Sequence, residues 1–299
     1  MKRPKTVASL ALVFSLVLVS CIQIGVVKAQ GTIYINEDGT VEGTDNIQRN
    51  ENVYTLTDDI YNSTITILKD DVVLDGAGHI VKGPANGVAL LHRNNVTVQN
   101  FTITTSSTSD NIYVYHCTNC TIQNNVITPF AEKYPGTGVS VWGGGSNVIT
   151  GNQIMNNLCG IFLGEATCNN SIIGNSITNN TGSIRVHGSQ NNSIYNNNFN
   201  NNHHISIMSI SPRITLVIEF DNGTSGNYWD NYRGTDPDGD GVGNTPYFIY
   251  EDYLDEYPLM EPVVVIPEFS SVVFLVVGVF AVTVLTMFSR KGLKQVRKR

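Results

Sequence analysis

The chain has 299 residues and a formal net charge of −7, and charged residues make up only 14% of it, against about 25% in an average soluble protein. Asparagine takes much of their place, with 34 positions in the chain and 24 of them between residues 94 and 202. Because the asparagine amide competes for backbone hydrogen bonds and disfavours helices, this composition excludes a coiled coil and most helical bundles.

Residues 1–29 have the pattern of a secretory signal peptide. A basic start at residues 2–5 is followed by an almost wholly apolar stretch over 7–27, with small residues at −3 and −1 of a cut after Ala29. A second interpretation is lipid attachment at Cys21, because residues 18–21 fit a lipobox. Both interpretations predict export.

The exported part of the chain is strongly acidic. All 25 Asp and Glu residues lie in 30–268, together with only eight of the 18 Lys and Arg residues, which gives that part a net charge of −17. Because nucleic-acid binding depends on neutralising phosphates, we expect no nucleic-acid partner.

Residues 30–70 are expected to form an N-terminal cap and the first strands, and residues 71–230 contain an internal repeat. An apolar-x-x-Asn-x-apolar motif recurs every 22 to 27 residues, and its copies begin at Val98 (with Phe101 in place of Asn), Ile122, Ile149, Ile172 and Ile194. A second apolar pair begins 13 or 14 residues before the Asn (or Phe101) of each copy, and these pairs begin at Val88, Ile112, Val139, Ile161 and Ile184. Two motifs that keep one phase indicate one structural unit per repeat.

The repeat length and its patterning predict the fold class. Each repeat holds two or three short β-branched runs with alternating apolar residues, separated by Gly and Asn, and none holds a helical pattern. The prediction is an all-β, right-handed, single-stranded parallel β-helix with one coil per repeat. Inward Ile and Val would stack about 4.8 Å apart, and turn asparagines would bond to one another along the axis. This bonding of turn asparagines accounts for the high asparagine content without a bound ligand.

Three further stretches carry a resemblance to a known family: residues 54–60 (YTLTDDI), residues 74–80 (LDGAGHI), and a closing stretch made of 226–232 (GNYWDNY), 236–244 and 257–260. With the repeats, they make residues 32–261 similar to the NosD-like right-handed parallel β-helix family, also called carbohydrate-binding and sugar-hydrolase repeats. The resemblance implies the fold, export, a link to polysaccharide and, for the family's namesake, copper delivery to nitrous oxide reductase. A C-terminal membrane anchor, which the sequence also predicts, departs from a soluble periplasmic protein, so a role in copper delivery is less favoured than polysaccharide binding.

Aligning the coils on the inward pairs places the outward residues in two columns. The first column holds Ala89, Tyr113, Ser140, Phe162 and Arg185, and the second holds Leu91, Tyr115, Trp142, Gly164 and His187. The aromatic members Tyr113, Tyr115, Trp142 and Phe162 should therefore share one exposed face on neighbouring coils. Aromatic planes of this kind stack against sugar rings, so we predict a polysaccharide-binding face; a ladder that serves only cross-strand packing is the alternative.

The two longest linkers, 104–111 and 128–138, open onto this face. They carry Asp110 and Glu132, the one pair of acids in the repeats suited to a glycoside hydrolase or lyase, because hydrolysis requires two neighbouring carboxylates. Catalysis therefore stays open, with a non-catalytic protein favoured.

Candidate metal ligands occur in three places. His92 and His116 fall in one column with Cys117 beside the second, and His203, His204 and Met208 offer soft ligands for copper. Asp236, Asp238 and Asp240 followed by Gly241 resemble the first half of a calcium loop, so calcium is the cofactor we favour and copper is disfavoured. A plain turn is the alternative.

Four exported cysteines, Cys117, Cys120, Cys159 and Cys168, predict either two disulfides or buried free thiols. Eight Asn-x-Ser/Thr sequons also occur, and four of them (Asn95, Asn119, Asn169 and Asn191) share one phase of the repeat. The repeat itself therefore generates them, although export permits glycosylation.

The C-terminal region predicts a membrane anchor. After a family segment at 231–262 and a linker at 263–269, residues 270–288 carry no charge, and six Lys and Arg residues follow in 289–299. The length suits a membrane-spanning helix, and the basic tail would stay in the cytoplasm. Pro267-Glu268-Phe269 resembles the archaeal PEF sorting signal, which implies an archaeosortase-type enzyme as a partner. We therefore expect an archaeal cell-surface protein that binds polysaccharide or builds surface structure.

Overall fold

The computed structural model describes residues 31–106, 108–130, 135–201, 203–208 and 217–265. The predicted signal peptide, the PEF motif, the span at 270–288 and the basic tail lie outside these residues. Within the described ranges, no helix is long and apolar enough to cross a membrane.

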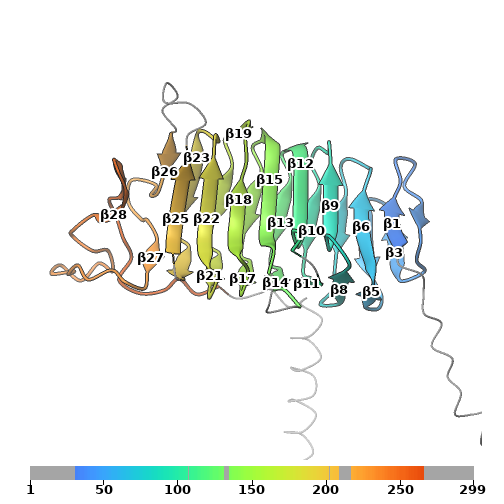
Figure 1. Ribbon diagram of the computed structural model, residues 1–299, viewed down its shortest axis with the longest axis horizontal. Coiled ribbons are helices and arrows are strands. Elements are labelled where there is room, and N and C mark those ends of the chain that lie inside the picture. The colour runs from blue at the N-terminus through green and yellow to red at the C-terminus, as the bar shows by residue number, and fades with distance from the viewer. Residues whose placement is uncertain (1–30, 107, 131–134, 202, 209–216, 266–299) are drawn as a thin grey trace, which may run out of the picture.

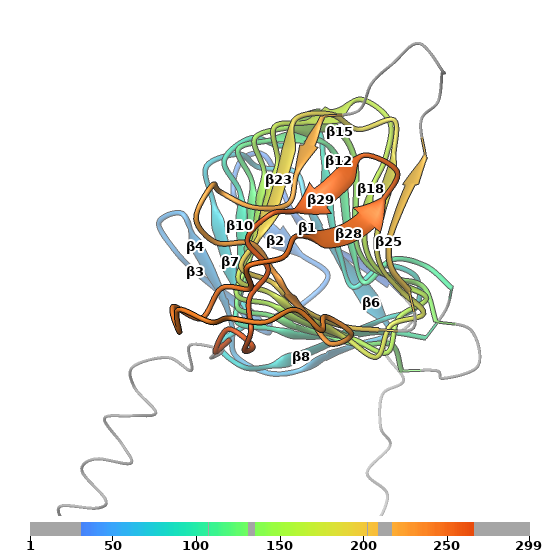
Figure 2. The ribbon, with the colours of Figure 1, turned by 90° about the vertical axis from the view of Figure 1, so that its left-hand side faces the viewer.

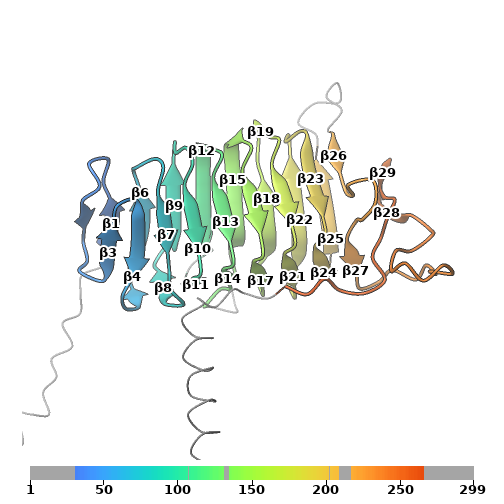
Figure 3. The same cartoon turned by 180° about the vertical axis from the view of Figure 1, so that it is seen from behind.

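The described chain is an all-β solenoid whose coils stack along the long axis of the molecule (Figures 1 and 3). Each complete coil adds one strand to each of three parallel sheets, here named A, B and C in the order in which the chain enters them. The predicted parallel β-helix is confirmed.

The bounds of the strands follow, in spatial order within each sheet. Sheet A contains β2 (Val41–Glu42), β1 (Gly31–Ile35), β6 (Ser63–Ile67), β9 (Val88–Leu91), β12 (Ile112–Thr118), β15 (Thr137–Gly145), β18 (Cys159–Leu163), β22 (Gly182–His187) and β25 (His203–Met208), with β19 (Thr167–Cys168) paired to β15. Sheet B contains β26 (Ile218–Glu219), β23 (Asn192–Tyr195), β20 (Ser171–Ile173), β16 (Val148–Thr150), β13 (Thr121–Gln123), β10 (Thr97–Gln99), β7 (Val73–Asp75), β4 (Val53–Leu56) and β3 (Ile47–Asn50). Sheet C contains β27 (Tyr228–Trp229), β24 (Asn198–Asn200), β21 (Ser176–Thr178), β17 (Gln153–Met155), β14 (Val126–Ile127), β11 (Thr102–Thr105), β8 (Ile80–Gly83) and β5 (Ile60–Tyr61).

The strand register follows the predicted phase of the repeat. In sheet B the motif residues pair from coil to coil, in the order Val98, Ile122, Ile149, Ile172 and Ile194. In sheet A the leading pairs do the same, in the order Val88, Ile112, Val139, Ile161 and Ile184. All of these side chains are buried, so they form continuous apolar ladders through the core.

Asparagine fills the interior turns. The side-chain amide of one coil donates to the Oδ1 of the next at 2.9 to 3.1 Å, except that Asn111, before β12, donates to Asn157, before β18, two turns further along the chain. Three ladders result: Asn125, Asn152, Asn175, Asn197 and Asn227; Asn147, Asn170 and Asn192; and Asn111, Asn157, Asn180 and Asn201. The predicted bonding of asparagines along the axis is confirmed.

A second set of asparagines occupies left-handed backbone positions, which most L-residues avoid and Asn tolerates. The set includes all four sequon residues that share one phase of the repeat, Asn95, Asn119, Asn169 and Asn191, with φ between 54° and 56°. The turn geometry of the repeat therefore accounts for asparagine at these positions.

Aromatic stacking and a hairpin close the C-terminal end of the core. Trp229 in β27 stacks on Phe199 in β24, with ring centroids 4.6 Å apart, and on Tyr247 at 4.4 Å. Tyr247 begins the hairpin β28 (Tyr247–Tyr250) and β29 (Tyr253–Asp255), which Figure 2 shows across the end of the stack. The core is thereby shielded where the repeats end.

Candidate functional site

The outer face of sheet A carries the predicted aromatic residues in the predicted columns. Tyr113 pairs in register with Ser140, and Ser140 with Phe162, while Tyr115 pairs with Trp142. The rings form two groups: Tyr113 and Tyr115 stack with centroids 5.9 Å apart, and Trp142 and Phe162 lie 4.9 Å apart. The four side chains are half-buried, so the face that was predicted to be exposed is only partly so.

Gly164 makes room for two of these rings. A Cβ atom on Gly164 would lie 2.7 Å from Cδ2 of Trp142 and 3.0 Å from Cε1 of Phe162. The indole therefore rests on the backbone of the next coil, and its Nε1 donates to Oγ of Ser140 at 3.0 Å. Seating against the backbone explains the partial burial and holds the ring plane in place.

The histidine column adjoins the aromatic residues. The rings of His92 and His116 are stacked with centroids 5.4 Å apart and an interplanar angle of 3°, and the Tyr115 ring meets both edge-on. Both histidines are exposed, but Cys117, the third ligand considered from sequence, is fully buried. The structure therefore brings together two of the three predicted ligands.

Asp110 lies half-buried just before β12, where burial raises the pKa of its carboxyl group; hydrogen bonds from the side chains of Thr137 and Ser140 oppose this rise. The carboxyl group is thereby placed beside the aromatic residues of sheet A. Glu132, its predicted partner, lies outside the described residues, so the pair stays a prediction.

All four exported cysteines are free thiols. The thiols of Cys117 and Cys120 are hydrogen-bonded to each other, and the pKa of the Cys117 thiol is lowered by that bond. Burial raises the pKa of Cys159 to about 11. Two disulfides are thus not formed in the structure; the alternative expectation, buried free thiols, holds for Cys117, Cys120 and Cys159, while Cys168 is half-buried.

The structure brings Asp236, Asp238 and Asp240 together, with one carboxylate oxygen of each within 4.8 Å of the others. The Asp236 carboxylate also accepts hydrogen bonds from the backbone N–H groups of Gly239 and Gly241, at 2.7 and 2.9 Å. These bonds, led by that of Gly241, lower the pKa of Asp236. They are the bonds of a tight turn, and calcium binding at this loop stays a prediction.

The copper ligands considered near the last coil do not converge. His203 and Met208 lie at opposite ends of β25, and at about 3.3 Å per residue their backbones are roughly 16 Å apart. His204 belongs to the same strand, but its side chain lies outside the description. His203 and Met208 therefore cannot share one ion.

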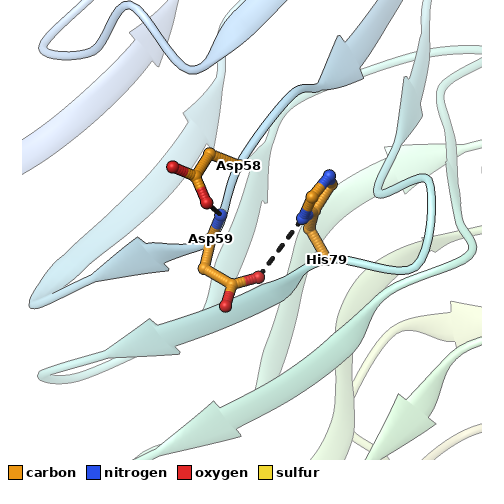
Figure 4. Close-up of side chains that lie close together, drawn as sticks. All are labelled: Asp58, Asp59 and His79. Atoms are coloured by element: carbon orange, nitrogen blue, oxygen red, sulfur yellow. Dashed lines mark hydrogen bonds and ion pairs between the residues drawn. The ribbon is translucent and has the colours of Figure 1, made fainter.

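A second cluster, which was not predicted from the sequence, joins Asp58, Asp59 and His79 (Figure 4). His79 Nδ1 lies 3.3 Å from Oδ1 of Asp59, and one oxygen of Asp58 lies within 4.8 Å of both ligand atoms. The Ile80 N–H group donates to Asp59 at 2.9 Å and leads the interactions that lower its pKa. The three residues belong to the YTLTDDI and LDGAGHI stretches of the sequence. Only the pairing of β5 with β8 brings these two stretches together.

The cluster fits a divalent transition ion in its donor atoms. An imidazole nitrogen beside carboxylate oxygens suits Cu(II) or Zn(II), and a separation of 3.3 Å is close to the edge of a tetrahedron with bonds of about 2.0 Å. His79 and Asp59 are each about one-third exposed, at 34% and 30% of the side chain. The ligand atoms are therefore accessible to an ion from solvent.

These features define a parallel β-solenoid with an aromatic outer face and a carboxylate–histidine cluster. A family model described as "Periplasmic copper-binding protein (NosD)" matches residues 20–234. Because this match covers more than half of the chain, the protein belongs to the NosD family, as its sequence motifs indicated. The family's periplasmic description agrees with export. The comparison with curated proteins finds no match.

Proposed function

We propose that the protein is a non-catalytic polysaccharide-binding protein and that the outer face of sheet A is its binding surface. The observation that carries the proposal is the seating of Trp142 and Phe162 over Gly164, which holds aromatic planes against the sheet. Flat, immobilised rings lose little conformational entropy when a ligand stacks on them. Tyr113 and Tyr115 extend the same surface by one coil.

A glycan array probed with the detergent-solubilised full chain tests this proposal. Tyr115→Ala should weaken binding about tenfold or more, since each ring offers a large apolar contact area. Tyr195→Ala is the matched control, because Tyr195 is also a half-buried outward tyrosine but lies on sheet B. Absence of glycan binding, or equal effects of the two substitutions, contradicts the proposal.

The alternative function on the same face is a hydrolase or lyase that uses Asp110. Burial raises the pKa of its carboxyl group, as is typical of a general acid. Product release from a bound glycan, measured as new reducing ends, distinguishes the two. Product release that is lost in Asp110→Asn would show that the protein is an enzyme. Glycan binding without product release supports the non-catalytic function.

Copper binding is the second candidate function, and it is favoured by the family description together with the cluster of Asp58, Asp59 and His79. Titration with Cu²⁺ should show one site per chain, with nitrogen and oxygen ligation in the electron paramagnetic resonance spectrum. His79→Ala should abolish this site, and His187→Ala should leave it intact because His187 lies outside the cluster. Retention of the signal in His79→Ala contradicts this candidate.

The anchoring of the protein belongs to the same proposal. The charge-free stretch at 270–288 and the basic tail support display on the outer face of a membrane. Cell fractionation, with the mass of the mature chain, tests both the signal cleavage after Ala29 and processing at residues 267–269. A full-mass chain in the soluble fraction contradicts the anchor.

A further inference from the structure

The outer face of sheet A differs in charge from the rest of the exported chain. Its nine parallel strands (β1, β6, β9, β12, β15, β18, β19, β22 and β25) contain no Asp or Glu, and Arg185 in β22 is their one Lys or Arg residue. The exported part as a whole carries a net charge of −17. A cation on an acid-free face of an acidic protein creates a local field that attracts anions.

Arg185 also differs from the other cations that the structure describes. Arg49, Arg93 and Arg233 donate hydrogen bonds to backbone carbonyls, Lys69 lies 3.4 Å from a carbonyl oxygen, and Lys82 lies over an aromatic ring. Within the described ranges, the ion pairs are His79–Asp59 and Arg93–Asp70. Arg185 is exposed, and its five donor hydrogens have no protein partner among the described residues.

The position of Arg185 continues the aromatic column. It pairs in register with Phe162, so it lies one coil beyond the aromatic rings on the same outer face. A cavity of about 550 Å³ opens there and is lined by Arg185, Leu158, Ser206, Met208 and Tyr250, among others. That volume is within the range of small-ligand sites.

Three acids border the face or its cavity: Asp110, Glu165, and Glu251, which is hydrogen-bonded to the side chain of Tyr250. Asp110 precedes β12 and accepts hydrogen bonds from the side chains of Thr137 and Ser140. Glu165 is exposed and follows β18, where its backbone carbonyl accepts the N–H group of Gly143. None of the three forms an ion pair with Arg185 in the described structure.

We propose that this face binds a carboxylated polysaccharide, one rich in uronic acids, with the sugar rings on the aromatic residues and a carboxylate paired with Arg185. The guanidinium fork matches a carboxylate in two parallel hydrogen bonds, which a neutral sugar cannot offer. The inference rests on the proposed polysaccharide binding and adds the chemical class of the ligand.

Affinity measurements on the full chain test the inference with matched ligands and matched variants. The probes are polygalacturonate, alginate and hyaluronan, each compared with the same polymer after complete methyl esterification, which removes the charge and keeps the sugar rings. Arg185→Gln should weaken binding of a carboxylated polymer roughly ten- to hundredfold, as expected for a hydrogen bond to a charged group. It should leave the esterified polymer unchanged. Arg233→Gln, an exposed arginine away from sheet A, is the control.

The possible outcomes separate this inference from the proposed function. Preference for a carboxylated form, lost in Arg185→Gln and weakened by salt, supports the inference. Equal affinity for charged and esterified forms, or no effect of Arg185→Gln, overturns it while polysaccharide binding stands. Failure to bind any carboxylated probe also overturns it. Unchanged binding of both forms in Trp142→Ala overturns the proposed function itself.

Discussion

The interior turns and the outer face of sheet A use the repeat in opposite ways. Along the longest ladder the same residue type recurs in consecutive coils, because each asparagine bonds to the one before and the one after. On the outer face the aligned residues change at every coil, from Ala89 through Tyr113, Ser140 and Phe162 to Arg185. The constant asparagine column forms the hydrogen bonds between successive coils. The outer column changes its residue type at every coil, so its side chains are free to contact a ligand.

The largest expected effect is on the constant column. Asn152 accepts two hydrogen bonds from Asn125 and donates to the Ile122 carbonyl and to Asn175. Asn152→Ala leaves several of these groups buried and unsatisfied, so we expect a loss of about 2–4 kcal/mol in the free energy of unfolding. Urea denaturation measures it.

The matched control for that prediction is Asn156→Gly. Asn156 is exposed and has a left-handed backbone at φ 63°, which glycine adopts without strain, so its effect should be close to zero. Equal destabilisation by Asn152→Ala and Asn156→Gly would show that the ladder contributes nothing beyond turn geometry.

Asp255 tests what happens where the constant column ends. Its buried carboxylate accepts hydrogen bonds from the backbone N–H of Asn227 and from Trp229 Nε1, at 2.7 and 2.8 Å. Burial nevertheless raises its pKa from 3.8 to about 6. Because the folded state holds this proton more tightly than the unfolded state does, the stabilisation is complete below pH 3.8 and is lost as the pH rises through about 6.

The shift corresponds to about 3 kcal/mol of unfolding free energy. Unfolding of the wild type and of Asp255→Asn, compared at pH 4 and pH 7, should show this component in the wild type only. Asparagine at this position cannot titrate, so a pH dependence that is identical in the two proteins rules out Asp255 as its source.

The sequence predicted the interior far better than the surface, for physical reasons. The period of the Ile, Val and Asn residues predicts which residues pair, because stacking equivalent residues of successive coils buries all of them. Asp58, Asp59 and His79 carry no such period, and their proximity arises only when β5 pairs with β8. The half-burial of Trp142 likewise depends on the absent Cβ of Gly164 in the next coil, a contact that no spacing rule reports.

Gly164 gives a smaller and more specific test of the outer face. In Gly164→Ala the new methyl group would displace the Trp142 ring by close contact, so we expect glycan binding to fall about threefold to tenfold, because the ring plane would be misplaced. Thr150→Ala is the control, because Thr150 is a half-buried residue of sheet B, away from the aromatic face. Glycan affinity that is unchanged in Gly164→Ala would show that the seating of the ring is unimportant.

The smallest expected effect completes the comparison. Trp142→Ala removes a half-buried ring that contacts Phe162 and bonds to Ser140, but it leaves the apolar ladders and the asparagine bonds intact. We therefore expect it to lower the free energy of unfolding by about 1 kcal/mol or less, well below the effect of Asn152→Ala, in the same urea series. If Trp142→Ala destabilises the protein as much as Asn152→Ala does, the aromatic column is part of the scaffold, and its variation from coil to coil reflects packing rather than ligand binding.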